Sequence, residues 1–147
     1  MPDPQAAWSF EHSVECHATA EFAWAYWTHV PNWRLDADVE SVEIDGPFAT
    51  GTRGRTRSKS SGVVDWRIVE AEPGRAVIEA PLPGAVLRFC WRFEEATEGT
   101  RMTQRCLLQG AQARTFADAA AAALEPGIPA GMRKLAESIE RAAGTRA

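Results

Sequence analysis

The sequence predicts a single α+β domain, residues 1–147, in which a curved antiparallel sheet of six to seven strands is wrapped on a long C-terminal helix. Segments of alternating apolar and polar residues follow one another between Trp8 and Gln109, which is the pattern of strands with one buried face. One short helical segment interrupts them after the first strand. The Ala-rich segment from Thr115 to Ala143 is the only predicted element long enough to cover the sheet. We therefore expect an internal cavity between the sheet and this helix.

The first strand is predicted over residues 8–16. Phe10, His12 and Val14 lie on one face of it, and the residues between them are polar. Because the apolar face must point inward, we expect the His12 side chain to point into the domain.

A short helix is predicted over residues 22–30. Thr19 is suited to cap its N-terminus, and Glu21 places a negative charge in the first turn, where the helix dipole favours one. Pro31 should end the helix, because proline cannot continue the backbone hydrogen-bond pattern.

Further strands are predicted from the same alternation and from the turns that separate them. They cover residues 39–44, 51–60, 63–71, 75–80, 87–94 and 102–108. Glu72-Pro73-Gly74 should form a turn, and Pro81-Leu82-Pro83-Gly84 should form a rigid loop. Consecutive strands joined by short turns form an antiparallel meander, whose first and last strands we expect to pair.

The C-terminal segment favours a helix, because Ala119 to Ala123 are five consecutive alanines. Proline disrupts a helix, so Pro126 and Pro129 predict a break or kink near residues 125–129. After this point, apolar residues at helical spacing predict a stripe that faces the sheet. The stripe consists of Ile128, Met132, Leu135 and Ile139.

The run from Glu21 to Thr28, followed by Asn32-Trp33, has the pattern of a known family's first helix. The segments 38–43, 45–48, 51–54, 82–85, 87–89 and 100–104 extend the same pattern. In all of these segments the chain resembles START-related (SRPBCC) proteins. The resemblance covers nearly the whole chain and implies a helix-grip fold around a hydrophobic pocket. Members of the family include lipid carriers, ligand binders, polyketide aromatase/cyclases and chaperone activators.

Composition excludes several classes of protein. The net charge of −4 argues against general nucleic-acid binding. No stretch approaches the roughly 18 apolar residues of a membrane span, and residues 1–5 do not resemble the start of a secretory signal. The three widely spaced cysteines predict reduced thiols in a cytoplasmic protein. No HExxH, CxxC or P-loop motif occurs, so we expect neither a metal nor a cofactor. A homodimer is compatible with all of these features.

His12 is the only candidate for a catalytic residue, and it has three interpretations. It could be a core histidine bonded to a backbone carbonyl or to Gln104, a ligand contact in the cavity wall, or a catalytic base. Gln104 lies between two apolar residues on its own face, and it could contact a ligand or act as a satisfied structural amide.

Aromatic side chains on inward strand faces are the other candidates for a ligand site. Trp66 and Trp91 could pack as cavity wall or stack on a flat ligand. The small residues of the third strand and the alanine run leave room for a cavity of roughly 300 Å³ or more. The tryptophans near the short helix, Trp24, Trp27 and Trp33, are expected in its core or rim. The predicted ligand-binding residues are His12, Thr56, Trp66, Phe89, Trp91, Met102, Gln104 and Met132.

Arg53, Arg55, Arg57 and Lys59 alternate on one face of the third predicted strand. Such a basic stripe is typical of a solvated outer surface that prevents association of sheet edges. The alternative is a docking surface for an acidic partner such as an acyl carrier protein.

The sequence therefore favours a protein that binds or carries a hydrophobic or aromatic small molecule without turning it over. A polyketide cyclase, aromatase or dehydratase is the first alternative, and it would require an acid or base inside the cavity. A protein-interaction module such as a chaperone activator is the second, and it would require a large exposed apolar patch.

Overall fold

The fold is described from a computed structural model over residues 6–34, 38–60 and 62–144. The strands are β1 (Trp8–Cys16), β2 (Val39–Ile44), β3 (Arg53–Ser58), β4 (Gly62–Glu72), β5 (Arg75–Leu82), β6 (Ala85–Ala96) and β7 (Gly99–Gln109). The helices are α1 (Ala20–Thr28), the 3-10 helix η1 (Val30–Trp33) and α2 (Ala113–Gly144). These elements confirm the predicted α+β class, and the sheet has seven strands where six to seven were predicted.

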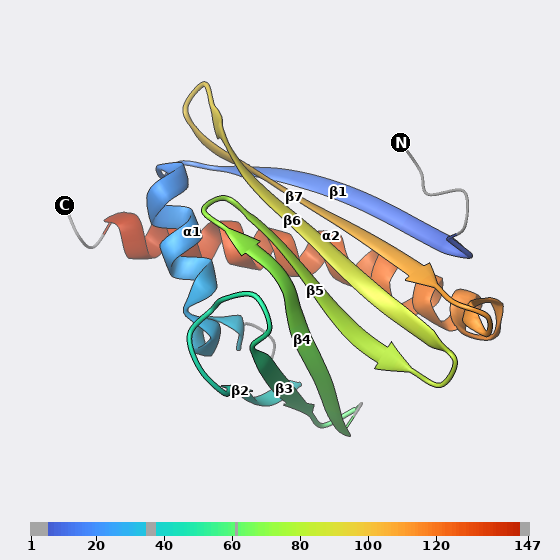
Figure 1. The fold of residues 1–147 in the computed structure, drawn as a ribbon. Helices are drawn as coiled ribbons and strands as arrows, with labels where there is room; N and C mark the ends of the chain where they lie inside the picture. Colours follow the sequence, from blue (N-terminus) through green and yellow to red (C-terminus); the bar gives the residue numbers. More distant parts are fainter. Residues whose placement is uncertain (1–5, 35–37, 61, 145–147) are drawn as a thin grey trace.

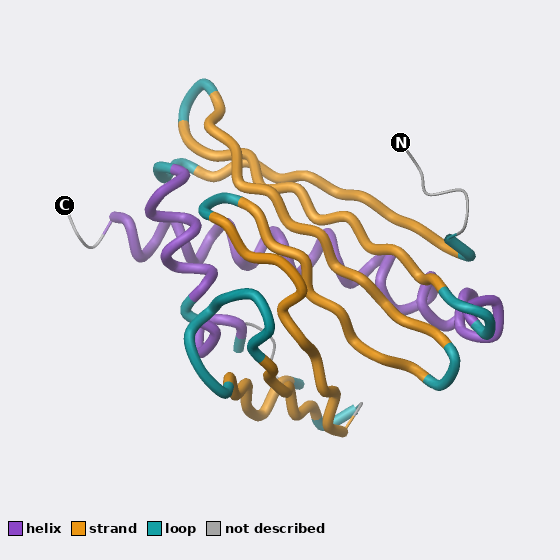
Figure 2. Tube along the Cα trace, viewed as in Figure 1, coloured by secondary structure: helices purple, strands orange, loops and turns teal. Residues whose placement is uncertain are grey.

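The seven strands form one antiparallel sheet in the order β1-β7-β6-β5-β4-β3-β2. Six of the strands follow one another as a meander, and β1 pairs with β7 along its whole length, from Trp8 opposite Leu108 to Cys16 opposite Thr100. The pairing of the first and last strands is thereby confirmed. Figures 1 and 2 show the sheet as one curved layer with α2 running along it.

Tight turns set the register of the meander. Gly74 joins β4 to β5 with φ +85°, and Gly84 joins β5 to β6 with φ +71°. Each follows a proline, which suits a turn whose first central residue has a fixed negative φ and whose second needs a positive one. The predicted loop at residues 81–84 is shorter than expected, because Pro81 and Leu82 extend β5 and pair with β6.

The helix α1 begins at the predicted cap, where the Thr19 hydroxyl accepts a hydrogen bond from the Phe22 backbone N–H at 3.1 Å. It ends at Thr28, two residues earlier than predicted, and Pro31 lies in the separate helix η1. Two side chains of η1 donate hydrogen bonds to backbone carbonyls that have no partner within the last turn of α1. Asn32 donates to the Tyr26 carbonyl at 2.8 Å, and the Trp33 indole donates to the Trp27 carbonyl at 2.6 Å.

The helix α2 is continuous over 32 residues, so a break near residues 125–129 is ruled out, while a kink there stays a prediction. Pro126 and Pro129 lie inside it and cannot donate to the carbonyls of Ala122 and Glu125. Both of those residues are exposed, so water can bond the freed carbonyls. The predicted apolar stripe, Ile128, Met132, Leu135 and Ile139, is buried against the sheet as expected. This packing offsets the local cost of the prolines. No helix in the described ranges is both long and apolar enough to cross a membrane.

The helix α2 follows β1, the strand at one edge of the sheet. The Trp8 indole N–H donates to Glu125 Oε2 at 2.8 Å, and the backbone N–H of His17 donates to Glu140 Oε2 at 2.8 Å. These contacts lie at the two ends of β1, so the helix and the strand run in the same direction. Open space lies between α2 and strands β3 to β7.

The three cysteines are free thiols. Cys16 and Cys106 are buried, whereas Cys90 is half-buried. Burial, with a smaller effect from the charge of Glu140, raises the pKa of Cys16 to about 11. Burial raises the pKa of Cys106 to about 12 and also raises that of half-buried Cys90, where Arg88 and Arg105 act in the opposite direction.

Thiol alkylation should therefore be selective in the folded protein. The thiolate is the reactive form, so at about pH 8 we expect iodoacetamide to modify Cys90 before Cys16 and Cys106. Peptide mass spectrometry gives the three rates, with the urea-unfolded protein as control. If the three cysteines of the folded protein reacted at equal rates, as they should in the unfolded protein, this burial pattern would be contradicted.

Candidate ligand-binding site

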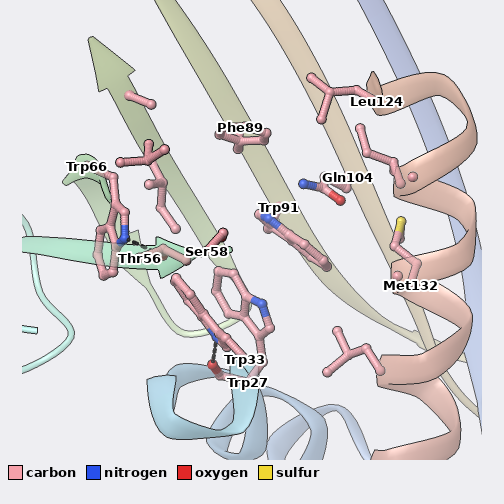
Figure 3. Close-up of a pocket in the computed structure, with 17 residues that line it drawn as sticks. Trp27, Trp33, Thr56, Ser58, Trp66, Phe89, Trp91, Gln104, Leu124 and Met132 are labelled. Carbon is pink, nitrogen blue, oxygen red and sulfur yellow. Dashed lines mark hydrogen bonds between the residues drawn. The ribbon is translucent and has the colours of Figure 1, made fainter. Parts of the chain in front are cut away.

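A cavity of about 520 Å³ lies between the sheet and α2. Strands β3 to β7 supply one wall, α2 supplies the other, and α1 and η1 each contribute one tryptophan (Figure 3). The volume lies within the range of small-molecule sites, roughly 300–1,000 Å³. Val64 of β4 is 39% exposed and lines the cavity, as do the exposed Gly127 and Gly131 of α2. The cavity therefore reaches solvent between β4 and α2.

Four tryptophans form a continuous row along the cavity. The ring centroids are 5.2 Å apart for Trp66 and Trp33, 5.5 Å for Trp33 and Trp27, and 4.8 Å for Trp27 and Trp91. Hydrogen bonds fix two of the rings, since Trp33 bonds the Trp27 carbonyl and the Trp66 indole donates to the Thr56 hydroxyl at 3.1 Å (Figure 3). The row presents an aromatic surface whose geometry is set before any ligand arrives.

Gly54 of β3 allows Trp66 to take its place in this row. It pairs with Trp66 across β3 and β4, and a Cβ at this position would clash with the indole ring and approach the Glu43 carbonyl at 2.7 Å. The indole therefore lies over bare backbone. A side chain at residue 54 would displace Trp66 and change the shape of the cavity.

Six of the predicted ligand-binding residues line this one cavity. They are Thr56, Trp66, Phe89, Trp91, Gln104 and Met132. The alternation of apolar and polar residues therefore assigned the inward faces of β3, β4, β6 and β7 in the correct register.

His12 and Met102 do not line the cavity, which corrects the expectation for both. His12 pairs with Gln104 across β1 and β7 and so shares its face of the sheet, but α2 follows β1 and occupies the space over that edge. Met102 is fully buried in the hydrophobic core. The only predicted candidate for a catalytic residue thus lies outside the cavity.

Trp27, Trp33, Gly127 and Gly131 line the cavity but were not predicted as site residues. The tryptophans belong to short helices whose orientation depends on the final packing. The glycines carried a usable signal, because they lie four residues apart on α2 and next to the buried Ile128 and Met132 of the apolar stripe. A cavity-facing strip of the helix without side chains could have been inferred from this spacing.

The cavity is apolar and uncharged. None of the lining residues in the described part of the chain ionises, and the polar side chains among them, apart from the indole N–H groups, are Thr56, Ser58 and Gln104. No group of three or more His, Cys, Asp or Glu side chains in the described ranges is arranged to hold a metal ion. The site therefore offers stacking surfaces and a few hydrogen bonds, but no ionic contact.

The basic stripe of β3 lies on the other face of the strand, as predicted. Arg53 and Arg57 are exposed, and Lys59 follows the end of the strand in an exposed position. Arg55 forms ion pairs with Glu43 and Asp45, both at 2.9 Å. These cations do not contribute to the cavity.

Comparison with known proteins assigns the chain to a family. A family model described as "Polyketide cyclase / dehydrase and lipid transport" matches residues 7–140. A search of curated proteins gave no match.

Solved structures with the same architecture are distant in sequence. Ara h 8.0201 has a TM-score of 0.73 at 11% identity, with 90% of this chain and 97% of that chain covered. The aromatase/cyclase Zhui from Streptomyces sp. R1128 has a TM-score of 0.72 at 16% identity, covering 91% and 94%. Norcoclaurine synthase from Thalictrum flavum has a TM-score of 0.66 at 14% identity, covering 91% and 84%. At these identities the likeness concerns the fold.

Proposed function

Because the chain belongs to the polyketide cyclase/dehydrase and lipid transport family, we propose that it binds or carries an uncharged aromatic or hydrophobic small molecule in the cavity between the sheet and α2. The observation that carries this proposal is the composition of the cavity wall. About 520 Å³ of space is bordered by four tryptophans and by no ionisable side chain of the described residues. Aromatic faces suit flat ring systems, while a buried charge without a partner is unfavourable.

The same composition favours binding over turnover. A cyclase or dehydratase usually needs an acid or base within hydrogen-bond reach of its substrate, and His12 does not line the cavity. A protein-interaction module receives less support, because the large exposed apolar side chains of the described residues are limited to Val63 and Val64.

The proposal predicts discrimination by charge. Isothermal titration with 2-naphthol should give a Kd of about 10–100 µM, which lies within the range that a ligand of this size can reach. Binding of 2-naphthoate should be at least about tenfold weaker, because its carboxylate would be buried without a counter-ion. The affinity for 2-naphthol should stay constant from about pH 6 to about pH 8, since no ionisable side chain of the described residues lines the cavity. Equal binding of both compounds would contradict the proposal.

The tryptophan indole N–H signals in a ¹⁵N NMR spectrum locate the bound compound. We expect 2-naphthol to shift signals of Trp27, Trp33, Trp66 and Trp91, which line the cavity. Trp8 is the internal control, because its indole is bonded to Glu125 outside the cavity. Shifts confined to Trp8 would place the ligand elsewhere. Conversion of polyketide mimics to new products under the same conditions would favour the cyclase alternative.

A further inference from the structure

Gln104 is the most deeply buried of the three polar side chains in the cavity wall, because Thr56 and Ser58 are only half-buried. It lies in the middle of β7, is 8% exposed, and pairs with Trp91 of β6 on one side and His12 of β1 on the other. Figure 3 shows its amide at the cavity next to Trp91. A polar side chain buried to this degree normally has a hydrogen-bond partner inside the protein.

The Gln104 amide has no hydrogen-bond partner among the residues that the structure describes. Its atoms are nevertheless not sealed in the core, because no fully enclosed side-chain nitrogen or oxygen of the described residues lacks a partner. The amide must therefore face the open space of the cavity. Thr56, in contrast, is already bonded to the Trp66 indole.

The neighbouring Trp91 adds a second hydrogen-bonding group beside the Gln104 amide. Its indole N–H also has no bonding partner in the described ranges, and the residue is 9% exposed. An amide supplies both a donor and an acceptor, and an indole supplies a further donor. The chemistry that complements this pair is a ligand oxygen that accepts one hydrogen bond and can donate another, such as a phenol or enol hydroxyl.

We propose that Gln104 is the specificity-determining residue of the cavity and selects uncharged ring compounds that place a hydroxyl group against its amide. This inference rests on the proposed function and names the feature of the ligand that the cavity recognises. A hydrocarbon of the same shape would fill the cavity equally well but would leave the amide unpaired. A site built to bond a hydroxyl rejects an analogue that lacks it.

The test compares 2-naphthol with 2-methylnaphthalene, which replaces the hydroxyl by a methyl group of similar size. We expect the wild-type protein to prefer 2-naphthol by about tenfold to a hundredfold in Kd. In Gln104→Met, which keeps the length of the side chain but removes the amide, the preference should fall to about threefold or less. The loss should come from weaker binding of 2-naphthol, with binding of 2-methylnaphthalene unchanged or improved.

Thr103→Val is the matched control, because Thr103 is buried beside Gln104 on the same strand, bonds Ser13, and does not line the cavity. It should keep the wild-type preference. The Gln104 side-chain NH₂ signals should shift with 2-naphthol and not with 2-methylnaphthalene.

Equal wild-type affinities for the two compounds, or an unchanged preference in Gln104→Met, would overturn the role of Gln104 and leave the proposed function standing. If neither compound binds the wild-type protein, the proposed function fails as well.

Discussion

Replacing both Gly127 and Gly131 by leucine is expected to weaken the binding of 2-naphthol at least about tenfold, which corresponds to about 1.4 kcal/mol. Both glycines line the cavity, and a Cβ on either would meet nothing within 4 Å. The new side chains can therefore enter the space that a ligand would occupy, and their apolar surface favours that placement over solvent.

The same change should not weaken the fold. Both positions lie inside α2, and neither has a positive φ. Leucine is a better helix former than glycine by roughly 0.7–1 kcal/mol per residue, so the free energy of unfolding should stay equal or rise. Urea denaturation and calorimetric titration measure the two effects separately. Ala130→Leu is the control, because Ala130 is exposed on the same helix and does not line the cavity. Wild-type affinity in the double variant would place the ligand outside this cavity.

Truncation of Ile139 to alanine should have the opposite pattern, with loss of stability and retention of binding. Ile139 has no exposed surface, belongs to the hydrophobic core and does not line the cavity. Removing its buried carbons should lower the free energy of unfolding by about 2–5 kcal/mol, from lost burial and from the void left behind.

Urea denaturation measures this loss, and Ile139→Val provides a graded control with an expected cost of about 0.5–1.5 kcal/mol. The affinity for 2-naphthol should remain within about threefold of wild type at a temperature where the variant is folded. A denaturation curve identical to that of the wild type would show that α2 is not anchored to the sheet through this residue.

Most of the fold could be predicted from local patterns. The alternation of Phe10, His12 and Val14 identified β1, and the helical spacing of Ile128, Met132 and Leu135 identified the buried face of α2. These patterns repeat the geometry of the element itself, in which successive strand residues point to opposite faces and helix residues recur every three to four positions. The prolines of α2 led to the wrong prediction of a break, because the helix stability lost at each proline is smaller than the stabilisation from burying the whole apolar stripe.

The limits of the sequence are clearest at His12 and Gln104. Both are polar residues on the apolar face of their strands, and they lie directly opposite each other across β1 and β7. The alternation in the sequence leads to the same prediction for both residues, yet Gln104 lines the cavity and His12 does not. Periodicity determines which face of the sheet a residue occupies, but it does not determine which part of that face a helix covers.

The path of α2 across the sheet determines why Gln104 borders the cavity and His12 does not. It is set by contacts between residues distant in sequence, such as the hydrogen bonds from Trp8 to Glu125 and from His17 to Glu140. The row of tryptophans has the same origin, because Trp27 and Trp33 from the short helices meet Trp66 and Trp91 from the sheet only after the chain has folded. Local patterns in the sequence were enough to identify the strands, the apolar stripe of α2 and the inward faces. They could not identify which inward residues border open space, because that depends on where elements far apart in the chain pack together.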